Sequence, residues 1–164
     1  MDKTRFLSGI TMAFVIVLSF LFLPLKILTP LISIVISLSA WEFFKLRFSS
    51  EISVVISLIL FFSLIYLSFG TGFKLTIISA GLLVWLIFGS LILGFPHNKN
   101  ILQNKYFWLI SGLLIHIPFW TSIFLIANFQ GTFLEHLGLG LSPRSTLVFM
   151  ISLSALMDTL AYFG

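Results

Sequence analysis

Long apolar runs constrain this chain more than any other feature. Six stretches are long enough, or nearly so, to cross the ~30 Å hydrocarbon core of a bilayer, which takes about 20 helical residues. They are Phe6–Leu23, Ile27–Phe44, Ile52–Phe69, Leu75–Phe95, Phe107–Ala127 and Thr146–Phe163. Lipid offers the backbone no hydrogen-bond partner, and the runs do not alternate as barrel strands would. The sequence therefore predicts an all-α, polytopic transmembrane helical bundle of about six spans.

Composition excludes the soluble alternatives. Hydrophobic residues make up 59% of the 164 residues and charged residues 9%, against roughly 25% charged in a soluble domain. The nine Lys and Arg residues are scattered between apolar runs, which argues against a nucleic-acid partner. Cysteine is absent, so disulfides and thiolate chemistry are excluded. We expect residues 1–164 to form a single transmembrane domain without a separate soluble part.

The predicted connections are short. We expect Pro24-Leu25-Lys26 to be a tight turn, with Pro30 in the first turn of the following helix. Gly70-Thr71-Gly72 should separate the third helix from the fourth, and residues 96–100 should form a polar loop.

The basic residues predict the orientation. With six spans, the two sides of the membrane hold six and three of them: Lys3, Arg5, Lys45, Arg47, Lys99 and Lys105 against Lys26, Lys74 and Arg144. The positive-inside rule places the richer side in the cytoplasm. We therefore predict a multi-pass protein of the cell (inner) membrane with both termini in the cytoplasm.

Asp158 is the ionisable residue with the clearest pattern around it. Ser154, Asp158 and Tyr162 follow one another at a spacing of four, so they form one polar stripe on a helix. A charge at membrane depth is costly and often functional. From spacing alone, the carboxylate either serves a site near the cytoplasmic end or bonds a neighbouring helix.

Two further residues need a reason for their place in apolar segments. Glu42 follows Trp41 near the end of its span, with Lys45 positioned for a local ion pair, so an interfacial anchor is the simpler interpretation. His116 lies near Pro118, which should kink its helix and free a carbonyl. We expect His116 to bond that backbone or a neighbouring helix rather than a metal.

The last residues of the chain point to a family. Ala155-Leu156-Met157-Asp158-Thr159-Leu160-Ala161-Tyr162 resembles a conserved segment of bacterial phosphatidate cytidylyltransferases, the CDP-diacylglycerol synthases. Leu23-Pro24, then Ala40-Trp41-Glu42-Phe43, and Gly112 six residues before Pro118 with Phe119 and Trp120 after it, are similar landmarks in the same order. Met157 departs from the family, which usually has a small residue there.

The resemblance implies a CTP-dependent nucleotidyltransferase of phospholipid biosynthesis. Its reaction converts CTP and phosphatidate to CDP-diacylglycerol and diphosphate with Mg²⁺ as cofactor. It implies Asp158 as the catalytic, metal-binding carboxylate, and Tyr162, Ser154 and Glu42 as substrate-binding residues.

The family continues beyond the segment at which this chain stops, through a C-terminal signature rich in polar residues. We therefore expect the chain to be the N-terminal portion of a longer cytidylyltransferase, inactive alone and complemented by a separate C-terminal half. Two alternatives stay open. One is a non-enzymatic membrane protein, either a truncated relative or a subunit. The other is a small transporter in which Asp158, His116 and Glu42 line one path.

Overall fold

Helices make up most of the residues that the computed structural model describes, which are 3–70, 72–94, 97, 99–129, 140 and 142–163. The side chains at 3–10, 12–13, 92, 99 and 154–163 lie outside that description. No strand occurs in these ranges, so the all-α prediction is confirmed for them. The helices are α1 (Lys3–Phe22), α2 (Leu25–Lys45), α3 (Ser50–Phe69), α4 (Lys74–Leu93), α5 (Lys99–Gln103), α6 (Lys105–Asn128) and α7 (Pro143–Phe163).

Four of these helices have the length and composition of membrane spans. Within the described part of the chain they are α2, α3, α4 over Lys74–Leu91, and α6. Large apolar side chains project from them, such as Phe62, which is 67% exposed, and Leu86, which is 72% exposed. Such surfaces suit lipid rather than water. The chain therefore has the helices of a membrane protein, whereas the count of six spans stays a prediction.

Two of the predicted connections are wrong in detail. Leu25 and Lys26 are already helical, because the Pro24 carbonyl accepts hydrogen bonds from the N–H groups of Ile27 and Leu28 at 2.9 and 3.0 Å. As a result Pro30 lies inside α2 rather than in its first turn. The polar loop expected at residues 96–100 is wrong at its last two residues, because the short helix α5 begins at Lys99.

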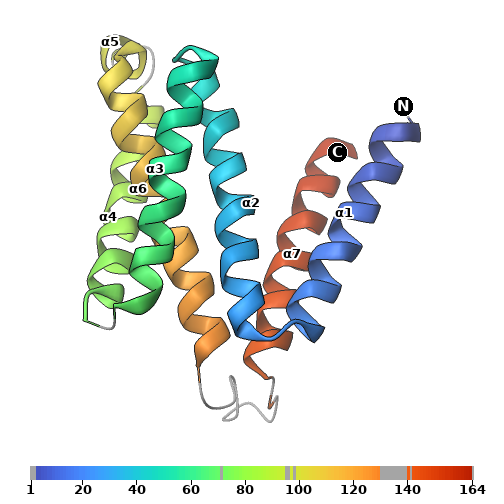
Figure 1. The fold of residues 1–164 in the computed structure, drawn as a ribbon. Helices are drawn as coiled ribbons and strands as arrows, with labels where there is room; N and C mark the ends of the chain where they lie inside the picture. The colour runs from blue at the N-terminus through green and yellow to red at the C-terminus, as the bar shows by residue number, and fades with distance from the viewer. Residues whose placement is uncertain are drawn as a thin grey trace. The chain divides into compact units, whose positions relative to one another are not determined.

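One compact unit contains α1 and α7, over residues 1–28 and 126–164. The two helices lie side by side and contact each other (Figure 1). Arg144 Nη1 donates a hydrogen bond of 3.2 Å to the carbonyl of Leu21. Helix α7 starts as the sequence favours, since Pro143 occupies its first position. Ser142 accepts a bond of 3.2 Å from the N–H of Ser145 through its hydroxyl.

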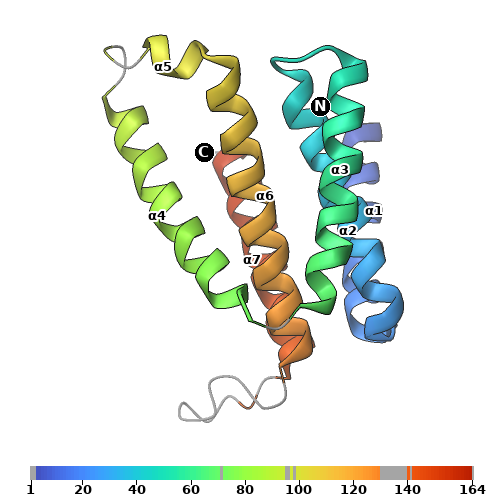
Figure 2. The same ribbon diagram turned by 60° about the vertical axis from the view of Figure 1, so that its left-hand side comes forward.

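The second unit covers residues 29–125 and contains α3, α4, α5 and most of α2 and α6. Successive long helices run in opposite directions, and α5 crosses between the ends of α4 and α6 (Figure 2). Helix α6 contacts α2 through Trp120 and Ser33, and it contacts α4 through Phe107 and Phe88, whose ring centroids lie 5.5 Å apart. Helix α6 therefore packs against α2 and α4, and it positions the residues of the candidate site.

Candidate functional site

The contact between α2 and α6 is built around a glycine. A Cβ atom at Gly112 would lie 2.4 Å from Cε1 of Phe44 and 3.0 Å from Cε1 of Phe43. Phe44 is only 1% exposed, so it has little room to move away. Phe43 continues the packing against α6, with its ring centroid 5.2 Å from that of Trp108. The missing side chain of Gly112 lets two aromatic rings of α2 approach the backbone of α6.

A buried hydrogen bond fixes the other end of this contact. Trp120 Nε1 donates to the Ser33 hydroxyl at 2.9 Å, and that hydroxyl donates to the Thr29 carbonyl at 2.9 Å. Ser33 and Trp120 are 0% and 1% exposed. Every polar atom in this chain of bonds has a partner, so the indole and the hydroxyl can lie in an apolar interior without the penalty of an unpaired group.

His116 lies between Gly112 and Trp120 on α6, and its ring bonds both its own helix and α2. Its Nδ1 lies 2.7 Å from the Gly112 carbonyl oxygen, and because a carbonyl only accepts, Nδ1 carries the proton. Nε2 is then an acceptor for the Ser39 hydroxyl, at 3.5 Å, a long and weak bond. The expectation of a backbone or interhelical bond is confirmed. The carbonyl involved is that of Gly112, however, and not that of Leu114, which Pro118 leaves without its helical N–H partner.

Cationic side chains gather at the end of α2 and the start of α6. The Lys45 ammonium lies 4.4 Å from the ring centroid of Trp41, and the Arg47 guanidinium lies 5.2 Å from that of Trp108. Both contacts are of the cation–π type. Glu42 is exposed at the same end of α2. Its expected ion pair with Lys45 is not formed, although both side chains are described, because the ammonium lies over the indole instead.

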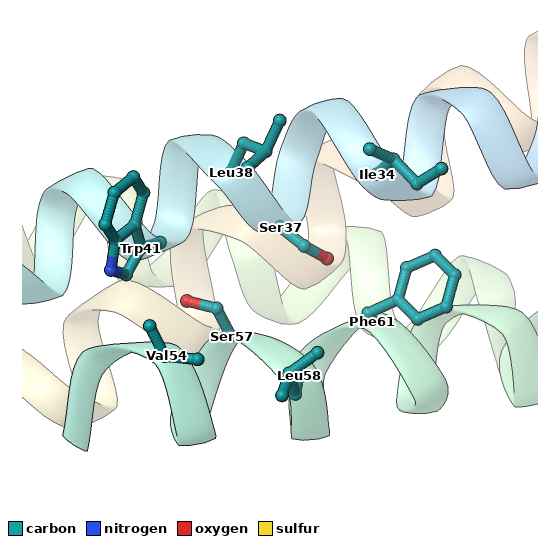
Figure 3. Close-up of a pocket in the computed structure, with 8 residues that line it drawn as sticks. All are labelled: Ile34, Ser37, Leu38, Trp41, Val54, Ser57, Leu58 and Phe61. Carbon is teal, nitrogen blue, oxygen red and sulfur yellow. The ribbon is translucent and has the colours of Figure 1, made fainter. Parts of the chain in front are cut away.

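A groove runs between α2 and α3 next to Trp41. It has a volume of about 410 Å³, and Figure 3 shows that its walls come from both helices. Three of its residues are polar, namely Ser37, Trp41 and Ser57. The others are apolar: Ile34, Leu38, Val54, Leu58 and Phe61. Ser33 and Ser37, four residues apart on α2, thus have different surroundings: Ser33 bonds Trp120 of α6, whereas Ser37 lines this groove.

Sequence reasoning missed two features of the second unit. The sequence predicts no role for Ser57, although Ser53 and Ser57 repeat at the same spacing of four as Ser33 and Ser37. For Lys74 it predicts only a contribution to the orientation in the membrane. In the structure it is 9% exposed, and its ammonium lies 4.1 Å from the ring centroid of Phe124. The sequence carries no signal for that pairing, since the two residues are fifty positions apart.

The predicted carboxylate stripe lies outside the description. Ser154, Asp158 and Tyr162 belong to α7, but their side chains are among those not described, so their catalytic, substrate-binding and metal-binding roles stay predictions. Among the described residues, no group of three His, Asp or Glu side chains gathers to hold a metal ion. The expected Mg²⁺ cofactor stays a prediction. The substrate-binding role of Glu42 also stays a prediction.

The structure thus brings together two segments that the sequence singled out separately, Ala40–Phe43 on α2 and Gly112–Trp120 on α6. Phe43 of the first segment packs at Gly112 of the second, and its ring centroid lies 5.8 Å from that of His116. Cationic groups lie beside these contacts at one end. Comparison of the chain with protein-family models, with curated proteins and with solved structures found no match.

Proposed function

We propose that this membrane protein takes part in CDP-diacylglycerol synthesis, as a relative of the phosphatidate cytidylyltransferases. In that reaction a phosphate oxygen of phosphatidate attacks the α-phosphorus of CTP. A new P–O bond forms, the bond from the α-phosphorus to the bridging oxygen breaks, and diphosphate leaves. Reactions of this kind depend on positioning and on neutralisation of phosphate charge more than on covalent help from the protein.

The main support for this proposal is that two of the segments that resemble the cytidylyltransferases pack against each other. Ala40–Phe43 and Gly112–Trp120 are separated by about seventy residues, and each was noted from sequence alone. Phe43 lies against Trp108 and the backbone at Gly112, and Ser39, next to the first segment, bonds His116 in the second. A shared ancestry with the cytidylyltransferases would account for both segments, because residues that build one contact are retained together.

The charge distribution of the second unit also supports the proposal. Lys45, Arg47 and Lys105 lie at the end where α2 finishes and α6 begins, whereas Lys74 lies at the opposite end, at the start of α4. The richer end is the cytoplasmic one by the positive-inside rule. CTP is a cytoplasmic anion, and the exposed Glu42 carboxylate lies at that same end, where it can contact a ligand. Mg²⁺, when bound, would neutralise phosphate charge, with Asp158 as the carboxylate proposed to hold it.

The test is a cytidylyltransferase assay on membranes that express the chain, supplied with labelled CTP, phosphatidate and Mg²⁺. One arm contains the chain alone, and a second co-expresses the C-terminal half of a cytidylyltransferase. We expect CDP-diacylglycerol to form in the second arm and to be lost with Asp158→Asn. Glu51→Gln is the matched control, because it removes a carboxylate from the first turn of α3. An absence of product in both arms, with the chain present in the membrane, would contradict the proposal and favour a non-enzymatic role.

The transporter alternative has less support. It requires Glu42 and His116 to line one path with Asp158. His116 is 7% exposed and uses both ring nitrogens within the helix bundle, whereas Glu42 is exposed near the end of α2. Neither residue lines the groove between α2 and α3.

A further inference from the structure

The groove between α2 and α3 contains three buried polar atoms without a hydrogen-bond partner. They are the hydroxyl oxygens of Ser37 and Ser57 and the indole nitrogen of Trp41. Both serines are more than nine-tenths buried, at 8% and 6% exposed, and all three residues line the groove. Figure 3 shows the two hydroxyls and the indole within the same stretch of the groove, with Ser37 and Trp41 on α2 and Ser57 on α3.

Several other serine hydroxyls of the same unit do have a partner. Ser53, Ser63, Ser79 and Ser111 each donate to the carbonyl four residues earlier in their helix, at 2.6–3.0 Å. That bond is the usual way for a serine to satisfy itself in an apolar environment. Ser37 and Ser57 line the groove and do not make this bond to the backbone. In lipid an unpaired polar group is costly, so the groove is built for an occupant that brings a hydrogen-bond acceptor.

The donors determine what the occupant must be. An indole N–H only donates, so an acceptor must face Trp41, while each serine hydroxyl can donate to the same kind of group. The apolar walls, formed by Leu38, Leu58 and Phe61 among others, require hydrocarbon. The Lys45 ammonium lies 4.4 Å from the ring centroid of Trp41, which lines the groove, so a positive charge next to that residue can attract an anion. An acceptor joined to hydrocarbon on one side and to phosphate on the other is the ester region of a phospholipid.

We propose that the groove between α2 and α3 binds one ester-linked glycerophospholipid. The two ester carbonyls of the lipid accept hydrogen bonds from the Trp41 indole and from the two serine hydroxyls, after small rotations of these side chains. The acyl chain lies along the apolar walls, and the phosphate approaches Lys45. A helix from a second copy of the chain fits less well, because its carbonyls are already bonded within the helix and it brings no anion to Lys45. The proposal does not rest on the proposed enzymatic function.

The experiment compares ester-linked with ether-linked phosphatidylglycerol, which share headgroup and chain length but differ in the carbonyl. Binding of each lipid to the purified full chain in detergent micelles is measured by native mass spectrometry and by thermal stabilisation. We expect the ester lipid to bind about fivefold more tightly, the equivalent of about one net hydrogen bond. Neither measurement needs CTP or turnover, so failure here is distinct from failure of the cytidylyltransferase assay.

Variants assign the preference to the groove. Trp41→Phe keeps an aromatic ring but removes the indole N–H donor, and it should reduce the difference in affinity between the two lipids. The Ser37→Ala/Ser57→Ala double variant should reduce it. Ser63→Ala is the matched control on α3, since that hydroxyl is already bonded to the Ile59 carbonyl at 2.8 Å, and it should leave the preference unchanged.

Three results would overturn the proposal. The first is equal affinity of the wild-type chain for both lipids, which requires no variant to fold. The second is an ester preference that survives intact in folded Trp41→Phe. The third is efficient cross-linking of a Leu58→Cys variant to a second copy or to another helix of the same chain, since the groove would then be covered by protein.

Discussion

Gly112→Ala tests the contact on which the second unit depends. The added Cβ would lie 2.4 and 2.6 Å from Cε1 and Cζ of Phe44. Ordinary van der Waals contact begins at 3.4 Å, so the overlap is about 1 Å (3.4 minus 2.4). Phe44 is 1% exposed and closely surrounded, so either its ring or the two helices must move. A shift of that size forfeits a substantial part of the dispersion energy across the contact.

The magnitude is best measured against a second glycine. Gly89 lies in α4 with nothing within 4 Å of the site where a Cβ would be added. Glycine to alanine favours a helix by about 1 kcal/mol, and that gain is common to both substitutions. The difference between them is therefore the cost of overpacking, about 1–3 kcal/mol. We expect Gly112→Ala to be the less stable of the two by that amount, which corresponds to about 2–4 °C in Tm for each kcal/mol.

The assay is thermal unfolding of the purified chain in detergent, followed by circular dichroism or by loss of monodisperse protein. A double variant adds a stricter check. Phe44→Leu should remove most of the overlap, so Gly112→Ala should cost less in that background, with a coupling energy of about 1 kcal/mol. If Gly112→Ala and Gly89→Ala shift the Tm equally, or if the double variant shows no coupling, the close approach of α2 and α6 at Gly112 is refuted.

Three further predictions concern the same unit. Trp120→Phe and Ser33→Ala should show a coupling energy of about 0.6–1 kcal/mol in a double-mutant cycle of thermal stability, because they share one buried bond of 2.9 Å; additive effects would contradict this. Gly81→Ala should be less stable than Gly89→Ala by about 1–3 kcal/mol in the same assay, since its Cβ would lie 2.5 Å from Cβ of Pro118, and equal stability of the two variants would contradict that contact. His116→Phe should lower stability by about 1–2 kcal/mol through loss of both ring hydrogen bonds, and a variant as stable as wild type would show that neither bond matters.

The sequence by itself determined the class of fold and the approximate extent of every long helix. The predicted segment Ile52–Phe69 matches α3 (Ser50–Phe69), and Phe107–Ala127 lies within α6 (Lys105–Asn128). The reason is that a backbone in lipid must bond to itself, so the length of an apolar run nearly fixes the helix. The residues at which the helices begin follow less directly from composition. The Pro24 carbonyl starts α2 earlier than expected, and α5 begins inside a segment that composition marked as loop.

Which helix faces which could not be predicted, because helices that are apolar on most sides give no preferred direction. Only the tertiary structure pairs Gly112 with Phe44, and only it directs the Lys45 ammonium to Trp41 instead of Glu42. The bond between His116 and Ser39 depends on where α2 lies. Likewise, Ser57 lines a groove with Trp41 only because α3 packs beside α2. Spacing along one helix records which residues share a face, but the partner of that face depends on how separate helices pack.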